Sequence, residues 1–376
     1  MSSGVPYPLE KLSLLEDGLF EAARIVSRRL EPNSLAVLVR KPILDEDCPE
    51  VSDVDLISVW EKPEELPERI TVESRMGRVF VDVLWIPVSK IFDPYEAASY
   101  KTLPHLLLNY EYLWAQSETV KQIINSIRLK TFEQDVWTRR IRHQLGFGDA
   151  ALEEAQKNLN YPPGALFYLQ TAHAYYVIAL ADCLKHSTMS LLTRPVTKLR
   201  QIDSEMNTDF EPLLRRNLHL DVEPSASLVA LRRVYNACAA KCASRQPLGV
   251  SMRARGHYDY SVSALELEYR ELVARALIAR GDYGNANFYL RFWGYSLSRC
   301  PVVLEESRQG RNPSFYVPFE PFKESVFAAC PESLEDMTII LGGGISKLGA
   351  EEAVKGTVLF KDLVVKQIET RGIRLT

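Results

Sequence analysis

Apolar residues recur every three or four positions over the first thirty residues of the chain. The stripe that includes Leu15, Leu19 and Val26 is typical of an amphipathic helix, because this spacing places its members on one face. We therefore predict a helix over Leu9–Leu30, which Pro32 ends.

Short apolar runs bounded by turn residues follow this helix, and they predict a sheet. The predicted strands cover residues 34–39, 51–60, 70–74, 78–86 and 110–114. Arg75-Met76-Gly77 indicates a hairpin turn between the third and fourth strands, and the fifth strand is predicted at an edge. Helical spacing returns over 88–108, with a break at Pro104, and over 119–129. This pattern predicts a small mixed sheet with helices on one side.

From about residue 131 the spacing is helical throughout. The predicted helices are Val136–Gln144, Ala150–Asn158, Ala165–Lys185, Pro195–Met206, Ser225–Ala243, Val262–Arg280, Gly284–Cys300, Glu320–Ala329 and Leu348–Ala353. Proline and glycine punctuate them, as at Gly281 and Pro301. The sequence thus predicts an α+β fold, with a mixed-sheet domain over 1–130 and an all-α helical bundle over 131–376.

The composition fits this reading. Of the 376 residues, 46% are hydrophobic and 25% are charged, which is the balance of a globular protein. The net charge of −4 supplies no overall field that would attract nucleic acid or an anionic membrane. No apolar run reaches about 18 residues, so we expect no transmembrane helix. The first residues also lack the basic start and apolar core of a signal peptide. We expect a cytoplasmic protein with no membrane partner.

The six cysteines are scattered, which in a chain without a secretion signal indicates reduced thiols. Cys238 and Cys242 are four residues apart. On a helix they would share a face and could form half of a metal site. No second pair of Cys or His lies nearby in the sequence, so the alternative is that both are ordinary buried thiols.

Three aspartates carry the strongest indication of chemistry. Asp53 and Asp55 are two residues apart at the start of a strand, so their side chains should project from the same face. Asp82 is the only charge in the apolar core of the strand 78–86, which follows Arg78, and a carboxylate there is costly unless it is paired or bound to metal. Neighbouring carboxylates repel one another, and a divalent cation between them relieves this. The alternative is that Asp53 caps a turn and Asp55 is an exposed residue at a strand start.

Ser52-Asp53-Val54-Asp55-Leu56, followed by a hairpin that carries Asp82, resembles the nucleotidyltransferase superfamily, which includes DNA polymerase beta and the aminoglycoside nucleotidyltransferases. The resemblance covers roughly the first 130 residues. It implies a two-metal Mg²⁺ site, with Asp53, Asp55 and Asp82 as metal ligands and catalytic residues. It also implies transfer of a nucleoside monophosphate from a nucleoside triphosphate to a hydroxyl of a small molecule, an RNA or a protein. Assembly as a homo-oligomer stays open.

One departure from the family pattern keeps a second function class open. The family has a Gly-Ser pair about a dozen residues before the acidic pair, where this chain reads Leu38-Val39-Arg40-Lys41-Pro42. Backbone N–H groups approach phosphates most easily at glycine. Ser52, Arg40 and Lys41 are the candidate nucleotide-binding residues, with Arg40 or Lys41 holding phosphate as a point charge. The alternatives are an exposed basic pair at a strand end and, for the whole protein, a catalytically inactive binding or interaction module.

Two basic groups allow a third class, an RNA-binding module. Arg139, Arg140, Arg142 and His143 could contact phosphate or RNA between the domains, or could form a solvated helix face beside acids of the first domain. Arg253, Arg255 and His257, followed by Tyr258 and Tyr260, could stack on and neutralise a nucleotide, or could be a plain loop.

Two further features invite a bland interpretation. Gly342-Gly343-Gly344 lacks the Gly-Lys-Ser/Thr ending of a phosphate-binding loop, so we predict a connector between helices. His173 lies among apolar and tyrosine residues, so we predict a buried core histidine.

Overall fold

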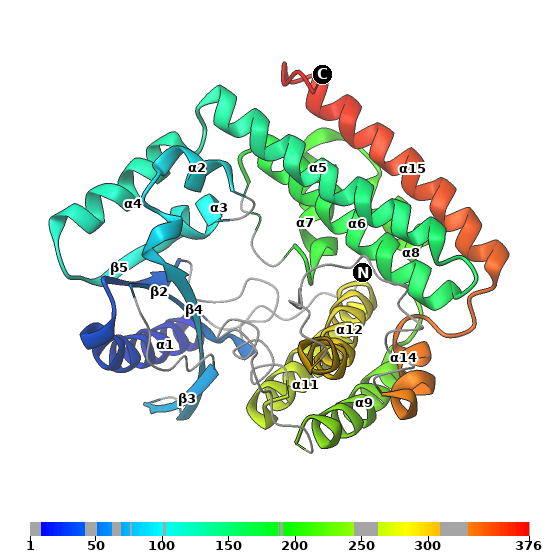
Figure 1. Ribbon diagram of the computed structural model, residues 1–376, viewed down its shortest axis with the longest axis horizontal. Coiled ribbons are helices and arrows are strands. Elements are labelled where there is room, and N and C mark those ends of the chain that lie inside the picture. Colours follow the sequence, from blue (N-terminus) through cyan, green and yellow to red (C-terminus); the bar gives the residue numbers. More distant parts are fainter. Residues whose placement is uncertain are drawn as a thin grey trace. The chain divides into compact units, whose positions relative to one another are not determined.

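A computed structural model describes residues 9–41, 51–61, 69–75, 77–100, 103–186, 188, 191–243, 262–308 and 330–375 (Figure 1). The contacts divide the chain into two compact units, Met1–Arg140 and Ile141–Thr376. The fold is α+β as predicted, with a mixed sheet in the first unit and helices in the second.

The first unit contains five strands and four α-helices among its described residues. The strands are β1 (Ala36–Arg40), β2 (Val54–Trp60), β3 (Arg69–Ser74), β4 (Gly77–Pro87) and β5 (Tyr110–Ala115). The helices are α1 (Leu9–Leu30), α2 (Pro94–Ser99), α3 (Leu103–Leu108) and α4 (Glu118–Lys130), with short 3₁₀ turns η1 (Glu31–Asn33) and η3 (Val88–Lys90). The predicted helix over 9–30 and the predicted edge strand over 110–114 are confirmed.

The strands lie in the order β3-β4-β2-β1-β5. β3 and β4 form the predicted antiparallel hairpin, with Ser74 opposite Gly77. Gly77 has φ +94°, a conformation that glycine adopts without steric cost and that suits a tight turn. β4 then pairs with β2 in parallel, whereas β1 pairs antiparallel with both β2 and β5. The sheet is therefore mixed, as the sequence predicts.

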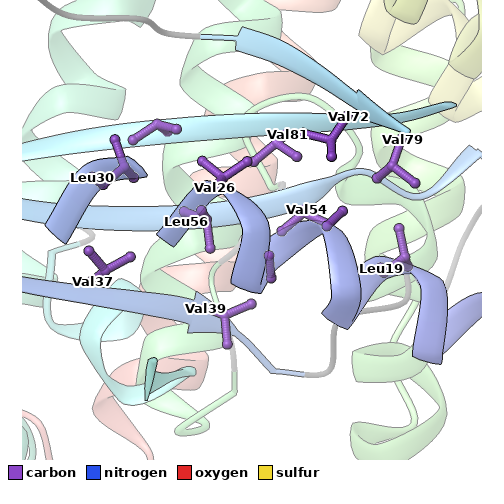
Figure 2. Packing of buried hydrophobic residues seen from close by; sticks show 13 residues of the cluster. Leu19, Val26, Leu30, Val37, Val39, Val54, Leu56, Val72, Val79 and Val81 are labelled. Atoms are coloured by element: carbon purple, nitrogen blue, oxygen red, sulfur yellow. The ribbon is translucent and has the colours of Figure 1, made fainter. Parts of the chain in front are cut away.

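α1 supplies the hydrophobic cover for one face of this sheet (Figure 2). Its residues Leu19 and Val26 pack against Val54 and Leu56 of β2 and against Val81 of β4. Because side chains alternate along a strand, the residues between these valines and leucines belong to the opposite face. That alternation decides where the aspartates lie.

The opposite face is not bare, so the prediction of helices on one side only is wrong. Tyr112 of β5 lies opposite Leu38, which alternates with the core residues Val37 and Val39. The Tyr112 hydroxyl donates a hydrogen bond of 3.3 Å to the carbonyl oxygen of Lys121 in α4. α1 and α4 thus lie on different sides of the sheet (Figure 1). The chain passes along the edge strand β5 before α4 begins.

The second unit is helical throughout its described residues. Its helices are α5 (Gln134–Lys157, which begins in the first unit), α6 (Pro162–Cys183), α7 (Pro195–Met206), α8 (Phe210–Leu218), α9 (Ser225–Ala243), α11 (Ala264–Ala279), α12 (Tyr283–Arg308), α14 (Leu334–Ile340) and α15 (Lys347–Glu369), with a 3₁₀ turn η4 (Pro331–Ser333). α6 is buried along nearly all of its length, because α7, α8, α12 and α15 pack against it. The predicted helix over 320–329 lies outside the described residues.

Several predicted helix ends are wrong for identifiable reasons. Two helices predicted on either side of residues 145–149 are one continuous helix, α5. Gly148 does not break it. Instead, a Cβ there would lie 2.4 Å from Cε1 of Tyr176, so the glycine permits close packing of α5 on α6. α12 likewise continues through Pro301, since burial of Val302 and Val303 offsets the cost of about 3 kcal/mol that proline imposes inside a helix.

α8 and α14 were not predicted, and α15 is much longer than the predicted segment 348–353. The signal for α15 was present in the sequence. Its buried residues recur every three or four positions, at Ala350, Ala353, Thr357, Phe360, Val364 and Ile368.

Candidate metal site

The three aspartates that the sequence predicts as metal ligands converge at one point. β2 and β4 run parallel, and Asp55 lies directly opposite Asp82 in their register. Asp53 lies two residues before Asp55 and on the same side. One carboxylate oxygen from each of the three lies within 4.8 Å of the other two. The predicted convergence is therefore confirmed.

Alternation along the strands explains the convergence. Val54 and Leu56 flank Asp55 and pack against α1, while Val81 and Val83 flank Asp82 and do the same. The aspartates must consequently project from the opposite face. All three are half-buried, so they are shielded from bulk solvent but not closed off from it.

The donor set suits a metal ion. Hard divalent cations bind carboxylate oxygens, and they complete their coordination with water where the protein supplies only some of the ligands. Three carboxylates this close repel one another in the absence of a cation. Among the residues that the structure describes, these aspartates are the one group of three or more His, Cys, Asp or Glu residues with ligand atoms this close together.

Arg40, a candidate nucleotide-binding residue, lies at the edge of this site. It is the last residue of β1, and its Nη1 donates to Oδ2 of Asp55 at 2.9 Å. The two side chains are 21% and 23% exposed. Asp55 is therefore not simply an exposed residue at a strand start. One of its oxygens is held by a guanidinium, and this pair connects β1 to the acidic site.

Lys41 and Ser52 are placed differently from Arg40. The Lys41 ammonium lies 3.9 Å from the centre of the Phe20 ring in α1 and 3.7 Å from Oε2 of Glu111. This is the α1 side of the sheet, away from the three carboxylates, so Lys41 does not share their face. Ser52 is half-buried directly before Asp53, and its nucleotide-binding role stays a prediction.

Tyr110 lies near the three aspartates. The sequence predicted only that it is part of an edge strand. It begins β5, where it lies opposite Arg40 in the register, and its side chain is buried. Burial raises the pKa of the Tyr110 phenol well above its usual range, and the negative charge of Asp55 raises it further. The phenol therefore stays protonated beside the acids. The signal that could have found it is the order of the strands, which a single sequence does not state.

The basic cluster after the sheet has structural partners. Arg140 is buried and donates to the carbonyl oxygens of Ala98 and Thr131 at 2.7 and 2.9 Å. Arg140 therefore fits neither the predicted phosphate or RNA contact nor the predicted solvated face, because its guanidinium is buried and bonded to backbone carbonyl oxygens. Arg139 pairs with Glu96 at 2.8 Å, as the bland interpretation expects.

Arg142 of the first basic group also has a structural partner. Arg142 donates to the carbonyl oxygen of Arg374 at 2.7 Å. The second basic group, over 253–260, lies outside the described residues.

The remaining candidates have the plain roles predicted for them. His173 is buried, and its Nε2 lies 3.0 Å from Oγ1 of Thr357. Gly342 and Gly344 have φ +100° and +96° and connect α14 to α15, so the triplet is a helix connector.

The cysteine pair lies in the core of the second unit. Cys238 and Cys242 are buried in α9, as the ordinary-thiol interpretation predicts. Cys242 packs with Cys300 of α12. A hydrogen bond with Cys330, together with burial, raises the pKa of Cys238 well above its usual range. The Cys238 thiol therefore stays protonated in the core.

Comparison with known proteins adds no assignment. No protein-family model matches the chain, and no curated protein sequence matches it significantly. None of the described helices combines the length and apolar character that crossing a membrane requires. The fold and the acidic site therefore stand on their own geometry.

Proposed function

We propose that this protein is a Mg²⁺-dependent nucleotidyltransferase, which moves a nucleoside monophosphate from a nucleoside triphosphate to a hydroxyl acceptor. The observation that carries the proposal is the convergence of Asp53, directly before β2, with Asp55 of β2 and Asp82 of the parallel strand β4, on the face of the mixed sheet opposite α1. The same three residues carry the family resemblance in the sequence. The acceptor is a small molecule, an RNA or a protein hydroxyl.

The roles follow from the side chains. Asp53, Asp55 and Asp82 would hold Mg²⁺, which prefers oxygen ligands. When bound, the metal would neutralise phosphate charge and orient the reacting groups. The acceptor oxygen attacks the α-phosphorus, the bond from that phosphorus to the β-phosphate oxygen breaks, and pyrophosphate leaves. The hydroxyl proton passes to the carboxylate of Asp82, and Arg40 holds a phosphate oxygen through its planar donors.

One observation favours a competing function, a non-catalytic binding module. The ion pair between Arg40 and Asp55 already compensates one acid, so the site has a stabilising contact that needs no metal. Arg40 also lies in the window where the family has its Gly-Ser pair, and its side chain occupies space near the site.

Nucleotide binding separates the two functions without knowledge of the acceptor. The full-length chain is titrated calorimetrically with ATP, GTP, CTP and UTP in turn, with Mg²⁺ and with EDTA. We expect saturable binding of at least one triphosphate that requires Mg²⁺. Asp53→Asn and Asp82→Asn should each weaken it at least about tenfold, since loss of groups that support a metal site costs this much.

Glu111→Gln is the matched control for these variants. It removes one carboxylate from the same sheet, but Glu111 lies opposite Val39 on the α1 side and pairs with Lys41. Its effect on nucleotide binding should be within about twofold. If no triphosphate binds at millimolar concentration, or if binding is indifferent to Asp53→Asn, the protein is not this enzyme and the binding-module function holds. Release of pyrophosphate with candidate acceptors then tests catalysis.

A further inference from the structure

Arg40 and a metal ion would draw on the same carboxylate. The guanidinium lies 2.9 Å from Oδ2 of Asp55, and Asp55 is one of three residues whose oxygens lie within 4.8 Å of one another. A cation bound by the three acids would therefore lie close to the positive charge of Arg40. Like charges at such separations repel appreciably, even at a half-buried site.

The position of Arg40 also suits a second partner. Its side chain is partly exposed, and a guanidinium presents a planar set of donors that matches the oxygens of a phosphate. A phosphate group at the metal would bring negative charge to the place where the repulsion arises. The guanidinium could then exchange a carboxylate oxygen for a phosphate oxygen without losing an anionic partner.

We propose that Arg40 couples the two ligands of this site, so that a divalent ion binds strongly only together with a phosphate group. The inference rests on the metal site of the proposed function and adds a regulatory role for one residue. In the absence of both ligands Arg40 pairs with Asp55. With both ligands present it contacts phosphate, and the metal takes the acids. By linkage, phosphate must raise metal affinity by the same factor by which metal raises phosphate affinity.

The test measures Mn²⁺, a spectroscopic substitute for Mg²⁺. Free Mn²⁺ is followed by electron paramagnetic resonance in solutions of the full-length chain, with and without inorganic phosphate, and a blank without protein corrects for Mn²⁺ bound by phosphate. For the unaltered chain we expect saturating phosphate to raise Mn²⁺ affinity about tenfold, a typical coupling between two ligands. Arg40→Gln should bind Mn²⁺ about tenfold more tightly than the unaltered chain without phosphate, and phosphate should change that affinity by less than about twofold.

Two variants control for charge and folding. Arg75→Gln removes one positive charge from the same unit, where Arg75 pairs with Glu21 of α1, and should leave Mn²⁺ affinity and its response to phosphate unchanged. Arg40→Lys keeps the charge and should retain part of the coupling. Circular dichroism checks that each variant is folded.

The outcomes separate this inference from the proposed function. If Mn²⁺ binds and Asp53→Asn abolishes it, but Arg40→Gln matches the unaltered chain with and without phosphate, the coupling role is refuted and the metal site stands. If the coupling is found but no nucleoside triphosphate binds, the nucleotidyltransferase proposal fails and the role of Arg40 stands. If no variant binds Mn²⁺ under either condition, both are refuted.

Discussion

Burial of His173 should make the second unit sensitive to mild acid. The imidazole is fully buried against Thr357 and Phe360, and burial lowers its pKa from the usual 6.5 to about 3. In the unfolded chain the same group regains a pKa of about 6.5. Between these values the unfolded state binds a proton that the folded state does not, so the free energy of unfolding must fall as pH decreases.

The size of the effect follows from the two pKa values. At pH 5 the unfolded imidazole is about 1.5 pH units below its pKa, which corresponds to about 2 kcal/mol of lost stability. This figure holds for any folded pKa below about 4, because the folded imidazole is then neutral at pH 5. The contribution is fully present above the unfolded pKa and is lost as pH falls towards the folded one.

Urea unfolding followed by circular dichroism at pH 7.5 and pH 5, for the unaltered chain and for His173→Gln, isolates this group. Glutamine does not titrate, so any packing cost of the substitution is the same at both pH values. We expect the unaltered chain to lose about 2 kcal/mol more than His173→Gln over this range. Equal losses in the two proteins would show that His173 is protonated in the folded state, and the reasoning from burial would be refuted.

Three further predictions concern metal and packing. Saturation with Mg²⁺ at about 100 times its dissociation constant should stabilise the unaltered chain by about 2.7 kcal/mol, and a thermal shift assay should find this gain absent in Asp53→Asn and after EDTA. Gly148→Ala should destabilise by about 1–3 kcal/mol, because the new Cβ meets the Tyr176 ring. Gly146→Ala, in open space on the same helix, should raise the free energy of unfolding by about 0.5–1 kcal/mol. If urea unfolding shows both variants shifted in the same direction, the packing argument is contradicted. Arg291→Met should lower the free energy of unfolding by about 1–3 kcal/mol, because Arg291 donates a hydrogen bond of 2.7 Å to the carbonyl oxygen of Leu218 at the end of α8. If urea unfolding finds no loss of stability, this hydrogen bond contributes nothing.

The elements that the sequence determined are those with a local periodic signal. The helix at 9–30, the hairpin and the acidic strand follow from spacings of three to four or of two, which the chain carries whatever it packs against. The same alternation assigned Asp53 and Asp55 to one face. Asp82 is the only charge in the apolar core of the next strand, so the convergence of the three could be predicted from the sequence.

Local periodicity and residue preference did not predict the ends of several helices. Gly148 and Pro301 are helix breakers by their intrinsic preference, yet α5 and α12 continue through them. Burial against Tyr176 in one case, and of the neighbouring valines in the other, decided the outcome. A propensity of about 1–3 kcal/mol is small beside the free energy of burying several apolar side chains.

Only the tertiary structure decided which groups surround the aspartates. Arg40 meets Asp55 because β1 lies beside β2, and Tyr110 joins them because β5 lies on the far side of β1. Lys41, one residue from Arg40, is turned to α1 instead. The lateral order of strands is set by long-range packing, to which residues far apart in the chain contribute. Periodicity therefore determined which side of its strand each residue faces, whereas the neighbours across the sheet came from the fold.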